Sequence, residues 1–157
     1  MHQWHPKRIV VPTDFSQQAM AGLDVAIRFA AESASRIFLI HVIDTTRLRP
    51  GRTLSLVRTQ ARKHLGRLCR MLHANGVDVV PLLEVGDPHQ EIARAARAAR
   101  ADLIIMSGKT VNGRGGDTSR SVLTQAPCEV WNVRVKPMSF RRIRASVGRS
   151  IPVKAAG

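Results

Sequence analysis

The sequence predicts an α/β protein built on a doubly wound, five-stranded parallel sheet with helices on both faces. Five short apolar runs alternate along the chain with segments whose apolar residues recur at helical spacing. This alternation is typical of a parallel sheet, because each crossover between parallel strands places a helix on one face. Several of the runs are almost continuously apolar, as expected for strands covered on both sides.

Each expected strand is a short run rich in Val, Ile or Leu. In chain order, the expected strands are 8–12, 36–44, 77–86, 103–106 and 129–135. Pro81 lies inside the third run, and proline cannot donate a hydrogen bond to a neighbouring strand, so we expect this strand at an edge of the sheet. The last strand is expected at an edge as well.

Helices are expected where apolar residues recur every three or four positions between these runs. In chain order, the expected helices are 17–34, 53–74, 87–102 and 118–126. Ser16 or Asp14 can cap the first helix, and Asp87 with Pro88 opens the third. Gly76 is expected to end the second. In such folds ligands bind beyond the carboxyl ends of the strands, where the strand order reverses.

The chain is strongly basic, with 25 Lys and Arg against 11 Asp and Glu and a formal net charge of +14. Such a field attracts nucleic acid, anionic lipid, nucleotides or acidic proteins, but a solvated arginine-rich surface gives the same count. Basic residues concentrate in the loop 45–52, in the helix 53–74 and in the tail 136–157. We expect a domain of residues 1–135 and a flexible tail.

Several classes of protein are disfavoured by the composition. No apolar run approaches the length of a transmembrane helix, and the N-terminus lacks a signal-peptide pattern, so we expect a cytoplasmic protein without membrane insertion. Cys69 and Cys128 are expected as reduced thiols, and the six histidines form no metal constellation. His41 is expected as a satisfied histidine of the core or pocket rim. A phosphohydrolase would have only Asp14 and Asp117 as carboxylates and no general base, so we expect no enzyme.

The segment "SGKT" (107–110) looks like the end of a P-loop, but the spacing excludes one. A P-loop needs a glycine five positions before Gly108, and that position holds Leu103 inside a strand. The later glycines are also wrongly spaced for a dinucleotide fingerprint. A glycine-rich turn that leads into a helix can still bind phosphate through backbone N–H groups. A plain surface loop is the alternative interpretation.

Some charged side chains of that loop favour phosphate binding, and one opposes it. Lys109 and Arg114 would add positive charge beside a phosphate. Asp117 would cap the following helix, but it places a negative charge where a phosphate would lie unless a cation bridges the two.

Taken in order, these segments resemble the universal stress protein family over roughly residues 6–135. The resemblance is carried by "RIVVPTDFSQQAMAGLDVAIRFA", "IFLIHVID", "VGDPHQEIARAARAARADLIIM" and "APCEVWNVR". The resemblance implies an adenine nucleotide alpha hydrolase-like sheet in the order 3-2-1-4-5. It also implies a non-enzymatic stress-response or signalling module. It further implies a homodimer through the last strand (129–135), with Trp131 as a contact.

Nucleotide-binding members of that family carry Gly-x2-Gly-x9-Gly followed by Ser or Thr. Here Ser107 takes the place of the first glycine and Gly116 that of the last, nine positions apart where the family pattern needs thirteen. Gly108 can stand for the second glycine, and Asp117 replaces the hydroxyl residue. The phosphate loop is therefore four residues short.

Outside the loop, the residues that match the family's nucleotide-binding positions are retained. Val42 matches the position whose backbone contacts adenine in that family. The candidate site comprises Asp14, Val42, Gly86, Ser107, Gly108, Lys109, Gly113, Arg114, Gly116 and Asp117. The ligand implied is ATP or another adenine nucleotide, with Mg²⁺ if it is a triphosphate. A member that binds no nucleotide stays open, since a broken loop is the hallmark of such members. A basic protein that binds nucleic acid or another polyanion through the helix 53–74 and the tail is the alternative function.

Overall fold

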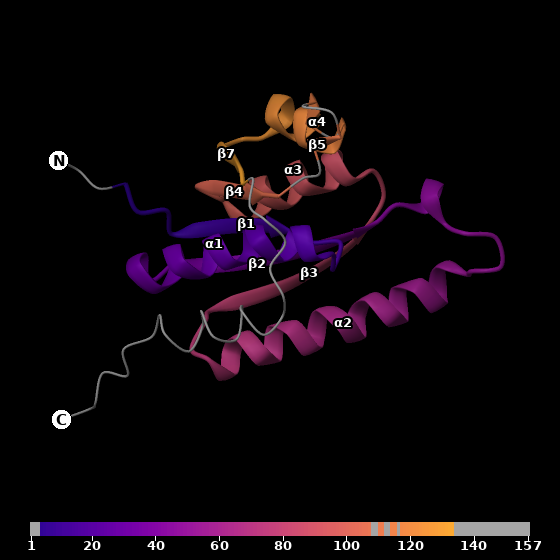
Figure 1. Cartoon of the computed structure of the whole chain (residues 1–157), viewed down its shortest axis with the longest axis horizontal. Helices are drawn as coiled ribbons and strands as arrows, with labels where there is room; N and C mark the ends of the chain where they lie inside the picture. The colour runs from indigo at the N-terminus through magenta and orange to yellow at the C-terminus, as the bar shows by residue number, and fades with distance from the viewer. Residues whose placement is uncertain (1–3, 108–109, 112–113, 116, 134–157) are drawn as a thin grey trace.

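A computed structural model describes residues 4–107, 110–111, 114–115 and 117–133 (Figure 1). Its strands are β1 (Arg8–Pro12), β2 (Arg36–Ile43), β3 (Val79–Val85), β4 (Leu103–Met106), β5 (Thr110–Val111), β6 (Arg114–Gly115) and β7 (Glu129–Asn132). Its helices are α1 (Gln17–Ser33), the short 3-10 turn η1 (Thr45–Arg47), α2 (Leu54–Ala74), α3 (Pro88–Ala99) and α4 (Asp117–Gln125).

The main sheet is parallel, and its strands lie in the order β3-β2-β1-β4-β7. The expected order 3-2-1-4-5 is thus confirmed, with β7 as the fifth strand. Among the described strands, β3 forms one edge, as Pro81 predicted, and pairs with β2 alone. β7 forms the other edge of this described sheet and pairs with β4 alone. The order reverses between β1 and β4, which places the opening for a ligand at their carboxyl ends.

Two hydrophobic layers hold the sheet between its helices. On one face, Leu23 and Ile27 of α1 and Leu72 of α2 pack with Ile9 and Leu39 of the sheet, all at most 1% exposed. The other face buries a smaller cluster against α3 and α4. Its buried members are Val10, Ile40, Ile92, Ala95, Ala96, Ile104, Met106 and Val122. Figure 1 shows α1 and α2 apart from the pair α3 and α4.

Capping side chains fix the starts of the helices. The Ser16 hydroxyl accepts a hydrogen bond from the Ala19 amide, so Ser16 caps α1 and Asp14 does not. Thr53 caps α2, and Asp87 caps α3 with Pro88 in the first turn. Past the end of α2, Gly76 adopts φ 77°, a conformation that favours glycine, as the sequence predicted.

The structure differs from expectation in short stretches. The strand expected from residue 77 begins at Val79, because the Val77 amide bonds to Leu72 O in the turn that ends α2. An antiparallel pair of two-residue strands, β5 and β6, lies inside the segment expected as a loop. The expectations for the tail 136–157 fall outside the described residues. Among the described residues, no helix combines the length and apolar character needed to cross a bilayer.

Candidate functional site

A cleft of about 710 Å³ opens at the carboxyl ends of β1, β2 and β4. Four of the residues singled out from the sequence line it: Asp14, Val42, Gly86 and Ser107. Its walls come from the turns after β1 and β2 and from the beginning of α3, with Ser121 of α4 opposite. The topology therefore joins segments that are far apart in the sequence.

The turn after β1 carries Asp14 to the mouth of the cleft. The Ser16 amide donates to Asp14 Oδ1 (2.9 Å), and the Phe15 amide donates to Thr13 Oγ1 (3.0 Å). Phe15 has φ 62°, a left-handed conformation that costs a non-glycine residue on the order of 1–3 kcal/mol. Ring contacts hold it there, at centroid distances of 4.5 Å to His41 and 5.5 Å to His64.

His41 is a structural residue of this turn, as expected. Its Nδ1 lies 2.7 Å from Thr13 O, and because a carbonyl only accepts, Nδ1 carries the hydrogen. Burial lowers the pKa of His41 despite the opposing effects of this hydrogen bond and of Asp14, and His64 lowers it further. His41 thus ties β2 to the turn in its neutral form.

Among the residues that the structure describes, none pairs with the backbone of Val42 on its β1 side. In a parallel ladder the N–H and C=O of one residue point to the same neighbouring strand, and alternate residues point to opposite neighbours. Ile40 O accepts from the Thr13 amide, so the N–H and C=O of Val42 also point toward the β1 side. There β1 has ended, and the Phe15 amide that would continue the ladder is bonded to Thr13 Oγ1. The Val42 edge therefore faces the cleft.

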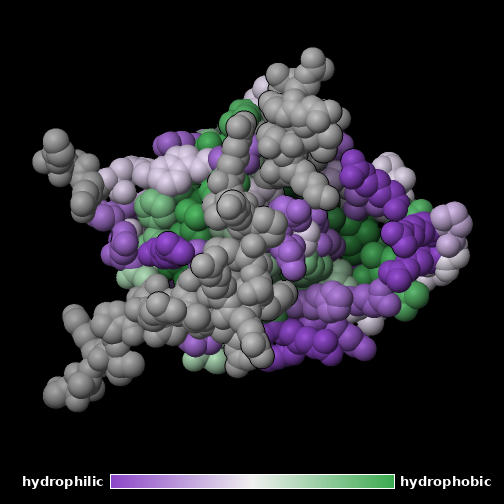
Figure 2. All heavy atoms as spheres, in the orientation of Figure 1, coloured by the Kyte–Doolittle hydropathy of each residue, from purple (hydrophilic) through white to green (hydrophobic). Residues whose placement is uncertain are grey.

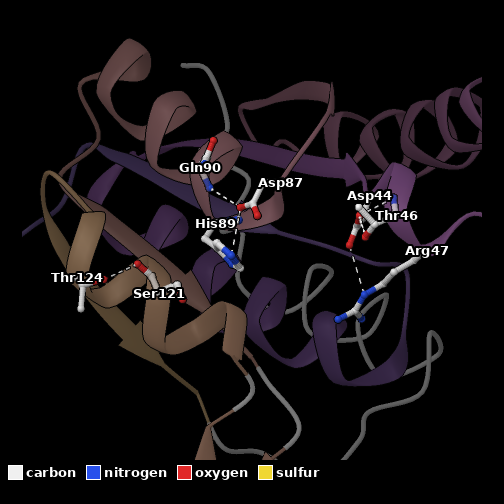
Figure 3. Close-up of polar contacts among 8 residues, drawn as sticks. All are labelled: Asp44, Thr46, Arg47, Asp87, His89, Gln90, Ser121 and Thr124. Carbon is white, nitrogen blue, oxygen red and sulfur yellow. Dashed lines mark hydrogen bonds and ion pairs between the residues drawn. The ribbon is translucent and has the colours of Figure 1, made fainter.

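The beginning of α3 forms a second wall. Gly86 has φ 151°, and a Cβ at this position would lie 3.1 Å from Glu91 Oε1, so both conformation and space favour glycine. Asp87 Oδ1 accepts from the amides of His89 (3.0 Å) and Gln90 (3.1 Å). His89 Nε2 lies 3.2 Å from the same oxygen. Figure 3 shows these side chains between the turn after β2 and α4.

The turn after β2 supplies a third group of polar side chains (Figure 3). Asp44 Oδ1 accepts from the Thr46 amide (2.9 Å) and the Thr46 hydroxyl (2.6 Å), and Asp44 Oδ2 lies 3.3 Å from Arg47 Nε. The hydrogen bond from the Thr46 hydroxyl is the main cause that lowers the pKa of Asp44. Asp44 is therefore a carboxylate at neutral pH, with Arg47 as its counter-charge.

Ser107 lines the cleft, but its hydroxyl already forms a hydrogen bond within the chain. Its Oγ donates to Gln18 O in α1, and a Cβ at Gly22 would lie 3.3 Å from the same Oγ. Ser107 therefore joins the end of β4 to α1, and Gly22 permits the close approach. The hydroxyl of Ser107 therefore holds the end of β4 against α1.

The remaining predicted residues are described only partly. Gly108, Lys109, Gly113 and Gly116 fall outside the described residues. Arg114 lies in β6, and Asp117 is the first residue of α4. The shortened phosphate loop thus stays a prediction.

Sequence reasoning missed several polar residues of the cleft, among them Asp44, Arg47, His89 and Ser121. Asp44 had a usable signal, since it directly follows a predicted strand at the ligand end of the sheet. The other three reach the cleft only through the packing of η1, α3 and α4. In the described part of the chain, no three His, Cys or carboxylate side chains lie together as a metal site requires.

A second hollow, of about 580 Å³, lies at the amino ends of the strands. Its polar groups bind one another: Arg36 Nε lies 2.8 Å from Asp78 Oδ2, and Asp102 Oδ2 accepts from the amides of Lys7 and Arg8. Lys7 Nζ donates to Ser33 O at 2.7 Å. These polar groups already have hydrogen-bond or ion-pair partners within the chain, so this hollow is a poorer candidate for a ligand site.

Two curated proteins of Methanocaldococcus jannaschii are similar in sequence. Universal stress protein MJ0577 is 28% identical over 127 residues, which cover 66% of this chain and 78% of the relative. Universal stress protein MJ0531 is 29% identical over 139 residues, which cover 82% of each.

Solved structures share the fold. The structure of MJ0577 matches with a TM-score of 0.76 at 25% identity, over 86% of this chain and 100% of that one. A universal stress protein in complex with cAMP matches with a TM-score of 0.66 at 20% identity, over 85% and 100%. One from Archaeoglobus fulgidus in complex with dAMP matches with a TM-score of 0.64 at 19% identity, over 83% and 100%.

The model of the universal stress protein family matches residues 5–134, which span the whole sheet and the helices packed on it. The match agrees with the resemblance found in the sequence and with the observed strand order. This chain belongs to the universal stress protein family.

Proposed function

We propose that the chain binds an adenine nucleotide in the cleft at the carboxyl ends of β1, β2 and β4. In this proposal it acts by binding, as a non-enzymatic stress-response or signalling module. The observation that carries the proposal is the open backbone edge of Val42. It lies beside apolar side chains and has Asp14 at the mouth of the same cleft.

The Val42 edge has the donor and acceptor that adenine requires. One N–H and one C=O side by side complement the adjacent ring acceptor and exocyclic amine of adenine, whereas guanine presents the reverse pair at that edge. Pro12, Val42 and Pro88, which line the cleft and are partly exposed, give it apolar surface against which a flat base can pack. We therefore expect adenine nucleotides to bind more tightly than guanine nucleotides.

Asp14 is suited to a ribose. Its Oδ1 accepts from the Ser16 amide, and because the residue is exposed, its Oδ2 can accept a hydrogen bond from a sugar hydroxyl. Structural neighbours support the nucleotide class, since two of them are complexes with cAMP and dAMP. ATP with Mg²⁺ is one member of that class.

Binding without turnover agrees with the carboxylates of the cleft. Asp44 and Asp87 each accept two local hydrogen bonds at the beginning of a helix or turn, and Asp14 holds its own turn. We propose that these carboxylates shape and line the cleft and that none of them acts as a general base.

Calorimetry with ATP, ADP, AMP, cAMP and GTP, with and without Mg²⁺, tests the proposal. Adenine nucleotides should release or absorb heat and raise the melting temperature, and GTP should bind at least about tenfold more weakly, about 1.4 kcal/mol. Asp14→Asn should weaken binding, while Asp78→Asn at the opposite end of the sheet should not. No heat and no thermal shift with any adenine nucleotide would show the proposal to be wrong.

We further propose a homodimer through the edge of β7 that pairs with no other described strand. The Val133 amide bonds to Met106 O, so by alternation the N–H and C=O of Asn132 point away from β4. The Trp131 indole packs inside its own chain against Phe29 and Trp4, so the backbone edge is the surface offered to a second copy. Asn132→Pro removes the outward N–H and should shift the mass in light scattering toward the monomer, whereas Asn132→Ala should not. A monomeric wild-type chain at high concentration would contradict the dimer.

We place this module in the cytoplasm, where thiols stay reduced. Cys69 and Cys128 are both free, and burial raises the pKa of Cys69 to about 11. Titration of unfolded, freshly purified protein with a thiol reagent should find both thiols. The recovery of both in a disulfide would contradict this placement.

A further inference from the structure

The loop before α2 and α2 itself carry exposed basic residues with no acidic residue among them, and we call this set of residues the α2 surface. From Thr45 to Val77 the sequence contains seven arginines, one lysine and no acidic residue. These basic residues are Arg47, Arg49, Arg52, Arg58, Arg62, Lys63, Arg67 and Arg70, and each is exposed. Figure 2 shows hydrophilic side chains along the α2 side of the molecule and over the loop that precedes it.

The core does not need these charges. The opposite side of α2 is anchored by Leu65, Leu68 and Leu72, which are 3%, 5% and 0% exposed. Lys63, Arg67 and Arg70 follow one another at spacings of four and three, so they form one stripe along the outward face. At 1.5 Å per residue this stripe is about 10 Å long.

Most of these charges also lack counter-ions within the described part of the chain. Arg47 pairs with Asp44, and Arg52 donates to Gln60 Oε1, but the basic residues of α2 take part in none of the described ion pairs. The loop arginines Arg47, Arg49 and Arg52 line a hollow of about 400 Å³. This arrangement presents positive charge to a partner outside the chain.

We propose that the α2 surface binds the phosphate backbone of double-stranded nucleic acid. Arginine presents a planar fork of N–H donors that matches phosphate oxygens, and seven of the eight cations are arginine. A duplex offers a regular array of phosphates to a stripe of this length. The binding is independent of base sequence, because a backbone contact reads no bases.

The same surface fits other polyanions less well. Single strands are bound by aromatic side chains on which bases stack, and residues 45–77 contain no aromatic other than histidine. An amphipathic helix binds a bilayer by inserting its apolar face, and that face of α2 is buried against the sheet. Leu54 and Leu56, 37% and 47% exposed, point to nearly opposite sides of the first turn and form no continuous apolar patch for a protein partner.

The test is the salt dependence of binding to a 20-base-pair duplex of arbitrary sequence, measured with the full chain by fluorescence anisotropy. Six phosphate contacts, from the outward stripe and the loop arginines, predict a slope of log K against log salt of about −5. The triple variant Lys63→Gln, Arg67→Gln, Arg70→Gln should make the slope shallower by about 3.

A matched control removes the same charge elsewhere. Arg8, Arg94 and Arg97 are exposed on other elements, and their triple change to Gln should leave the slope within about 1 of wild type. Circular dichroism checks that both variants keep their helix content. Equal changes in both variants, or no binding at about 50 mM salt, would overturn the proposal. Tighter binding to a single strand of equal charge, or to phosphatidylserine vesicles, would overturn it as well.

Discussion

The two ends of the sheet both carry polar hollows, of about 710 Å³ and 580 Å³, but they differ in what their polar groups bind. At the amino end, Asp102 accepts two backbone amides and Arg36 pairs with Asp78. At the carboxyl end, β1 stops beside Ile40 and the chain turns away, and Val42 faces the cleft. This difference is why we propose the carboxyl end as the nucleotide site, since its unmatched backbone edge can bind a ligand.

The largest expected effect comes from filling the carboxyl-end cleft. Ser121 lines it from α4, and Ser121→Trp should place an indole where the base would lie. We expect nucleotide affinity to fall at least about 100-fold, about 2.7 kcal/mol. Asp78→Trp, a change of the same kind at the amino-end hollow, should leave affinity within about twofold. Equal effects of the two variants in calorimetry would remove the distinction between the ends.

Substitutions at the amino-end hollow should change the stability of the fold. Asp102→Ala removes the acceptor of the Lys7 and Arg8 amides, at 2.7 Å and 2.8 Å, and should lower the free energy of unfolding by about 1–3 kcal/mol. Asp78→Ala breaks only an exposed ion pair and should cost less than about 1 kcal/mol. Urea unfolding measures both. If Asp102→Ala lowers the nucleotide affinity under conditions where the variant is fully folded, the two ends of the sheet are not independent.

A smaller expected effect is a pH dependence of stability that comes from His41, which contacts the turn that carries Asp14. Folding lowers the pKa of His41, mainly by burial, so below pH 6.5 the unfolded chain takes up a proton more readily than the folded one. The contribution of His41 to stability is therefore lost as the pH falls below that value. In His41→Asn, which keeps a donor toward Thr13 O, urea unfolding should show a weaker loss between pH 7 and 5. An unchanged pH profile would exclude His41 as its source.

Much of the fold could be read from the sequence because its strands are continuous apolar runs with clear ends. Residues 8–12 and 103–106 were predicted to the residue as β1 and β4. The pair β5 and β6 could not be predicted, since two-residue strands carry no periodicity. The beginning of β3 was missed because the end of α2 uses the Val77 amide, which is a tertiary effect.

The candidate site was predictable where it depends on strand ends. The sheet brings Asp14, Val42 and Gly86 into one cleft because each lies at the carboxyl end of its strand or directly beyond it. Ser107 also lies there, but its bond to Gln18 O depends on how closely α1 packs on β4. His89 was missed for the same reason, since it reaches the cleft through the placement of α3.

The central claim, that the Val42 edge receives an adenine nucleotide, is tested most directly by amide NMR of the ¹⁵N-labelled chain during titration with ATP, AMP and cAMP. We predict the largest shifts at the amides of Val42, Asp14 and Gly86, saturating with the calorimetric affinity. The amides of Arg8 and Asp78 at the amino end should not move. Saturating shifts confined to the amino end, or no shifts with any adenine nucleotide, would contradict the account.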